Sequence, residues 1–124
     1  MVSVFDTRPC SLGEGPLWHP LRGELFWFDI NAHQLLSKTN MWQFDEFVSA
    51  AGWISQDELL IASESQLFHF HLSDHSQSKI CDLEADNPVT RSNDGRCDPQ
   101  GGFWIGTMGK KAEAKAGAIY RYYR

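Results

Sequence analysis

A single carboxylate, Glu14, stands between two glycines in the segment SLGEGPLWHP and directly precedes Gly15 and Pro16. Glycines on both sides allow the backbone to approach other groups closely or to adopt a positive φ angle. A carboxylate on such a backbone suits calcium or magnesium, which prefer oxygen ligands, and zinc accepts the same donor. The alternative is a solvated turn residue, because glycines mark turns whatever their function. Glu14 is therefore the candidate metal ligand of this segment.

A second polar cluster, TRSNDGRCDP, runs from Thr90 to Pro99. Arg91 and Asn93 lie two positions apart, so in an extended segment their side chains point to the same side. A planar guanidinium and an amide together suit a polyhydroxylated or carboxylated small molecule. The alternative for Asn93 is an ordinary turn, because Asn and Asp before Gly are common there.

Both clusters precede short apolar runs that have the length of strands. These runs are rich in aromatic and β-branched residues, and they are Glu24–Ile30, Glu58–Ser63 and Gly102–Thr107. Their nearly continuous hydrophobicity predicts strands that are covered on both faces. Turns before the runs recur with a period of about 40 residues, which is the length of a four-stranded propeller blade.

Further strands are expected after each run. They are His33–Lys38, Gln66–Leu72 and Gly117–Tyr122, and a fourth strand such as Trp42–Val48 or Lys79–Leu83 would complete a blade. The polar stretch 110–116 is expected to be a loop. Propellers close with about four to eight blades, and this chain holds about three. The sequence therefore predicts an all-β fold, with residues 1–124 forming a single incomplete β-propeller domain.

The composition excludes several classes of partner. The net charge is −5 and the eleven Lys and Arg residues are scattered, which argues against nucleic-acid binding. No apolar run approaches the length of a membrane span, and the N-terminus has no signal-peptide pattern. The three cysteines form no C-x-x-C pair, so a reduced, cytoplasmic chain with buried cysteines is expected.

Other chemically suggestive residues are given structural roles. His69 and His71 alternate with Phe68, Phe70 and Leu72, so the two histidines are expected to face solvent on an outer strand. Asp29 could cap a strand or line the channel, and the structural role is favoured. The tryptophans that recur at equivalent places of the repeat are predicted to pack in the core, and they are Trp18, Trp27, Trp53 and Trp104.

Three motifs resemble the gluconolactonase family that includes senescence marker protein (regucalcin). They are LGEGPLW at 12–18, NDGRCDPQGGFWIGTM at 93–108 and GAIYRY at 117–122. The resemblance implies a six-bladed β-propeller, of which this chain supplies about the first three blades. It also implies hydrolysis of a sugar lactone to the aldonic acid. The implied cofactor is one divalent cation on the propeller axis, Ca²⁺ or Zn²⁺, with Mg²⁺ or Mn²⁺ also suitable.

The resemblance also assigns roles to individual residues. Glu14 matches a metal ligand of the family, and Arg91 and Asn93 match substrate contacts. Lys111 occupies the place of a substrate-binding glutamate of some members, and this departure leaves the sugar open. The other metal ligands, an asparagine and a proton-relaying aspartate, belong to later blades, so the catalytic residue is expected beyond residue 124. The oligomeric state stays open.

Two alternatives to lactone hydrolysis remain from the sequence. One is a related metal-dependent propeller hydrolase that acts on phosphotriesters, because polarised esters and phosphoesters share a chemical logic. The other is a catalytically inactive truncated propeller, or one that only binds calcium. A lone carboxylate from one blade cannot complete the coordination shell of a metal ion.

Overall fold

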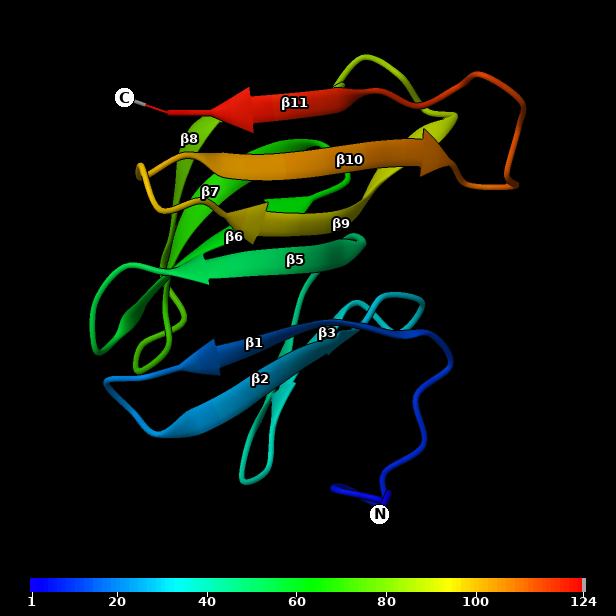
Figure 1. Ribbon diagram of the computed structural model, residues 1–124. Helices are drawn as coiled ribbons and strands as arrows, with labels where there is room; N and C mark the ends of the chain where they lie inside the picture. Colours follow the sequence, from blue (N-terminus) through cyan, green and yellow to red (C-terminus); the bar gives the residue numbers. More distant parts are fainter. Residues whose placement is uncertain (124) are drawn as a thin grey trace.

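The computed structural model describes residues 1–123, which form three antiparallel sheets and no helix (Figure 1). Blade 1 has the strand order β1-β2-β3-β4, blade 2 the order β5-β6-β7-β8, and blade 3 the order β11-β10-β9. The strands are β1 (Gly13–His19), β2 (Glu24–Asp29), β3 (Gln34–Ser37), β4 (Met41–Gln43), β5 (Val48–Trp53), β6 (Glu58–Ser63), β7 (Gln66–His71), β8 (Gln77–Asp82), β9 (Thr90–Cys97), β10 (Phe103–Gly109) and β11 (Ile119–Tyr122). The predicted all-β architecture of successive blades is confirmed.

The first strands of the three blades, β1, β5 and β9, lie side by side with β5 in the middle (Figure 1). We call them the hub strands. They run in the same direction, so their N-terminal ends gather at one end of the molecule (Figure 1). A hydrogen bond joins two of them there, because the Ser49 hydroxyl donates to the Ser92 hydroxyl over 2.7 Å. The hub strands therefore bring distant parts of the sequence to one place.

Each hub strand contains a bulge, which lies near the N-terminal end of β1 and β5 and in the middle of β9. In β1, Glu14 pairs with Phe28 and Leu17 pairs with Phe26, so two residues of β1 oppose one residue of β2. The register of β5 shifts between Val48 and Ala50, and that of β9 shifts opposite Gly106. A bulge bends a strand and changes the direction of its side chains. The bulge in β1 therefore directly follows Glu14, and the bulge in β9 contains Asn93.

Blade 2 is packed on both faces. Leu59 and Ile61 of β6 join the core shared with blade 1, whereas Leu60 and Ala62 join the core shared with blade 3. This confirms, for the middle blade, the prediction of strands covered on both faces. Blades 1 and 3 each have one face that no other blade of the described chain covers.

The prediction that the recurring tryptophans pack in the core is wrong for three of them. Trp18 is 58% exposed, Trp104 is 44% exposed and Trp53 is 39% exposed. Trp104 alternates with the buried Phe103 and Ile105, so it lies on the face of blade 3 that points away from blade 2. The buried tryptophan is Trp42, which is 5% exposed and whose Nε1 donates to the Leu72 carbonyl over 3.0 Å.

The structure differs from several of the local predictions. The structure places β4 at Met41–Gln43 only, and Val48 begins the next hub strand. His69 and His71 are half-buried rather than facing solvent, and Cys97 is exposed rather than buried. The stretch 110–116 forms turns and no helix, as expected. No part of the described chain forms a helix that could cross a membrane.

Candidate functional site

Glu14 lies at the N-terminal end of β1 and is half-buried. The chain reaches it through a loop held by Asp29, which is 4% exposed. The backbone N–H groups of Ser11 and Leu12 donate to the two carboxylate oxygens of Asp29 over 2.9 and 3.1 Å. Asp29 thus has the structural role expected of it, and it fixes where β1 begins. In residues 1–123 the carboxylate of Glu14 takes part in no ion pair.

The position of Glu14 is set by its neighbour Gly15. Gly15 is buried and has a φ angle of 61°, in the left-handed region that favours glycine. A Cβ atom added to Gly15 would overlap the carbonyl oxygen of Ser49 in the neighbouring hub strand. The glycine is therefore required for the close approach of β1 to β5, and this contact holds Glu14 at the hub.

Arg91 is the second residue of β9 and is only 7% exposed. Its Nη1 donates to the Ser92 carbonyl over 2.8 Å and to Asn93 Oδ1 over 3.2 Å. Burial lowers the pKa of the guanidinium, and the nearby Glu14 carboxylate opposes that shift. The structure therefore brings Glu14 and Arg91 into electrostatic range of each other, and it places Asn93 on the same side as Arg91.

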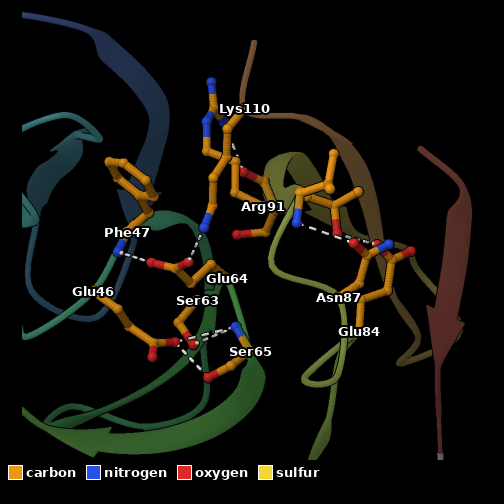
Figure 2. A network of polar contacts seen from close by, with 12 residues as sticks. Glu46, Phe47, Ser63, Glu64, Ser65, Glu84, Asn87, Arg91 and Lys110 are labelled. Atoms are coloured by element: carbon orange, nitrogen blue, oxygen red, sulfur yellow. Dashed lines mark hydrogen bonds and ion pairs between the residues drawn. The ribbon is translucent and has the colours of Figure 1, made fainter. Parts of the chain in front are cut away.

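Lys111 lies in the loop that follows β10 and is exposed. Its backbone N–H donates to Glu113 Oε1 over 2.8 Å. The preceding residue, Lys110, is tied to the start of β9, because its backbone N–H donates to the Val89 carbonyl over 2.8 Å. The side chain of Lys110 forms an ion pair of 2.8 Å with Glu64 of blade 2 (Figure 2). The loop that carries Lys111 therefore begins at the same end of the hub as Arg91.

Glu84 is a positioning residue that the sequence analysis did not identify. It accepts hydrogen bonds from Thr90 Oγ1 (2.6 Å), Thr107 Oγ1 (2.9 Å) and Tyr120 Oη (2.6 Å), which belong to the three strands of blade 3. Glu84 also has a positive φ angle of 47°. Its place in the polar stretch LEADNP is typical of a solvent-exposed loop, so no local signal marks it.

The protonation state of Glu84 follows from these contacts. Burial acts to raise the pKa of Glu84, but the hydroxyl donors of Thr90, Tyr120 and Thr107 outweigh it, so the pKa is lowered from 4.5. The carboxylate form is thus stabilised in the folded state. Its contribution to stability is complete above the unfolded-state pKa and is lost as the pH falls through the lower folded-state value.

Replacing Glu84 by glutamine should lower the free energy of unfolding by about 1–3 kcal/mol at pH 7, because an amide cannot accept all three hydroxyl bonds. At pH 3 the difference between variant and wild type should shrink, because the wild-type carboxylate then begins to be protonated. Urea unfolding at both pH values measures this. Asp86→Asn, an exposed change in the same loop, is the control. Equal stability of Glu84→Gln and wild type at pH 7 would contradict the assigned role.

Glu14 suits a divalent cation as one ligand, but the described residues do not form a complete cation site. Glu14 offers a half-buried carboxylate, without an ion-pair partner in residues 1–123, at the point where three hub strands meet. However, the described part of the chain contains no group of three or more His, Cys, Asp or Glu side chains that could hold a metal ion. Glu14 can therefore supply one ligand of a metal site and not a complete coordination shell.

Three blades whose first strands share a hub define this protein as part of a β-propeller, with a polar site at one end of the hub. Residues 12–123 match the family described as "SMP-30/Gluconolactonase/LRE-like region". The chain belongs to this family, and the family resemblance inferred from the sequence is confirmed.

Individual relatives agree with this assignment. A solved structure of a calcium-binding protein, regucalcin, from Agrobacterium tumefaciens is 39% identical, with a TM-score of 0.90 over 94% of this chain and 41% of that chain. The L-arabinolactonase of Azospirillum brasilense is 34% identical, covering 98% of this chain and 42% of the relative. A Bacillus subtilis (strain 168) protein, provisionally named a sugar lactone lactonase, is 37% identical, covering 97% of this chain and 43% of the relative. The chain therefore spans less than half the length of these relatives.

Proposed function

We propose that this protein hydrolyses a sugar lactone to its aldonic acid, with a divalent cation bound by Glu14. The observation that carries the proposal is the meeting of Glu14 and Arg91 at one end of the hub. They come from different blades. The negative charge of Glu14 acts to raise the pKa of the buried Arg91, against the effect of burial. Membership of a family whose named relatives include lactonases supports the reaction type.

Each candidate residue of this chain would have a separate role. Glu14 would bind the cation, together with ligands from blades beyond the three described here. The bound cation would contribute Lewis acidity at the lactone carbonyl. Arg91 and Asn93 would hold the oxygens of the sugar and so orient the carbonyl toward that cation, which lowers the barrier by positioning. Lys111, in the loop that follows β10, would contact the far side of the sugar.

Release of acid from glucono-lactone, followed with a pH indicator, tests the proposed reaction. The assay is run on the 124-residue chain and on the longest natural protein that contains it, with Ca²⁺, Zn²⁺, Mg²⁺ or Mn²⁺ and with a chelator. In the protein that carries the whole site, we expect hydrolysis faster than the spontaneous rate. This hydrolysis should require one of these ions. A rate equal to the spontaneous one with every ion, in both proteins, would contradict the proposal.

A calcium-binding role without catalysis is the second candidate, favoured by the similarity to regucalcin of Agrobacterium tumefaciens, which is described as a calcium-binding protein. The same experiment separates the two, because a protein that only binds calcium would take up the ion and leave the lactone at its spontaneous rate. The assay is repeated with a phosphotriester as substrate, to test for the related propeller hydrolase that acts on phosphotriesters. Hydrolysis of the phosphotriester in preference to the lactone would replace the proposed reaction.

A further inference from the structure

Glu64 lies in the turn between β6 and β7, at the end of the hub where Arg91 also lies (Figure 2). One oxygen of its carboxylate, Oε1, accepts a hydrogen bond from the backbone N–H of Phe47 over 3.1 Å. The other oxygen, Oε2, forms an ion pair of 2.8 Å with Nζ of Lys110. Phe47 lies in the connection between blade 1 and blade 2, and Lys110 directly follows β10 of blade 3. A single carboxylate of blade 2 therefore contacts the segments that come from both neighbouring blades.

The contacts around Glu64 are partly protected from water. The side chain of Glu64 is 21% exposed and that of Lys110 is 31% exposed. The ammonium of Lys110 lies 5.8 Å from the ring centroid of Phe47, which packs against the core shared by blades 1 and 2. A fully exposed ion pair contributes little to stability, because water screens the charges and two flexible side chains must be ordered. The Glu64–Lys110 pair should contribute more, because Phe47 already restricts both partners.

The loop 110–117 depends on this ion pair for its contact with blade 2. Its other hydrogen bonds are to groups of the loop itself, the end of β10 and the segment before β9. Within residues 1–123, the Glu64–Lys110 pair is the only ion pair or hydrogen bond between the loop and blade 2. Ala112 and Lys115 have positive φ angles of 58° and 61°, which non-glycine residues rarely adopt. The loop conformation therefore needs support from outside the loop.

We propose that Glu64 is a positioning residue of the lactone site, which acts through Lys110 to hold the loop 110–117 beside Arg91. The proposal rests on the proposed function, in which this loop carries Lys111 and Arg91 orients the sugar. Glu64 itself is assigned no contact with sugar or cation. A loop that is already held in place lowers the ordering cost of substrate binding. The effect of Glu64 is therefore expected in KM and not in kcat.

Glu64→Gln tests this role, because the amide keeps an oxygen that can accept from Phe47 but loses the charge that binds Lys110. In the protein that carries the whole site, KM for glucono-lactone should rise about fivefold and kcat should stay within about twofold. Lys110→Met and the double variant should show the same KM as Glu64→Gln, because all three remove one contact. Lys110→Arg keeps the charge and should retain the wild-type KM. Asp82→Asn is the matched control, because it breaks the exposed ion pair of 2.9 Å with Lys79 on the outermost strand of blade 2.

Hydrogen exchange of the backbone amides in 111–117 measures the position of the loop without a reaction. It is followed by mass spectrometry on the 124-residue chain and on the longest natural protein that contains it. Glu64→Gln should raise the exchange rate of these amides about fivefold, and Asp82→Asn should leave it unchanged. Urea unfolding of each variant checks folding, and Lys110→Met serves as the second variant if Glu64→Gln does not fold.

The positioning role is overturned if loop exchange is unchanged in Glu64→Gln, if kcat falls while KM stays constant, or if the effects of Glu64→Gln and Lys110→Met on KM add. Its failure is distinct from that of the proposed function. Lactone hydrolysis with unchanged loop exchange removes only the role of Glu64. If the wild-type protein does not hydrolyse the lactone, the proposed function fails, and the role of Glu64 in a lactone site fails with it even where the loop exchanges faster.

Discussion

Replacing Glu14 by glutamine should lower divalent-cation affinity at least about 100-fold and reduce lactone hydrolysis to a similar extent in the protein that carries the whole site. The amide keeps the size of the side chain, but it replaces one acceptor oxygen by an NH2 donor and removes the negative charge that attracts the cation. Glu14 has no ion-pair partner in residues 1–123, so this change breaks no salt bridge of the described fold. The loss is therefore expected in binding and catalysis and not in stability.

Calorimetric titration with Ca²⁺ and Zn²⁺, together with the lactone assay, measures the effect of Glu14→Gln. Glu58→Gln is a suitable control, because Glu58 is a half-buried carboxylate at the start of β6, the end of blade 2 remote from Glu14. This control should retain both cation affinity and turnover. Unchanged cation affinity in Glu14→Gln would show that Glu14 is not a metal ligand. The proposed function would then lose the residue on which it depends.

The sequence predicts those strands that have a strong apolar pattern. β6 and β10 were found because aromatic and branched residues are concentrated in them, and the turns before them repeat. β5 was not predicted, since its central residues are Ser49, Ala50, Ala51 and Gly52, which have weak strand propensity. The structure explains this composition. A Cβ atom added to Gly95 of β9 would lie 3.2 Å from the Ala50 Cβ, so adjacent hub strands leave room only for small side chains.

The tryptophans show what a single sequence cannot decide. Period-two alternation separates the two faces of a strand, but it does not say which face another blade covers. Trp104 and Phe103 are adjacent and both aromatic, yet Phe103 is buried and Trp104 is exposed. The packing partner decides this difference, and that partner lies in a different blade.

The part of the candidate site that lies at equivalent positions of the repeat could be predicted from the sequence. Glu14 and Arg91 are each the second residue of the first strand of a blade, and the hub brings such positions together. Glu84 was not predicted, because its three hydroxyl partners are far apart in the sequence and become neighbours only after β9, β10 and β11 pair. A carboxylate whose role depends on tertiary contacts leaves no local pattern.

Gly15→Ala should cost about 2–4 kcal/mol of unfolding free energy, a large share of the stability of an ordinary small domain. Two effects add at this position. An alanine at a φ angle of 61° carries the left-handed backbone penalty of about 1–2 kcal/mol. Its methyl group must also push β1 away from the Ser49 carbonyl of β5, which is backbone and cannot swing aside as a flexible side chain could.

Gly23→Ala separates these two effects. Gly23 has the same φ angle of 61°, but an added Cβ would meet nothing within 4 Å. Its alanine variant should therefore show only the backbone penalty in urea unfolding, and the excess loss in Gly15→Ala measures the contact between β1 and β5. Equal losses in the two variants would mean that the hub tolerates separation of these strands. In that case the close approach that holds Glu14 at the hub would not be required for the fold, and the position of Glu14 would have to depend on the Asp29 loop alone.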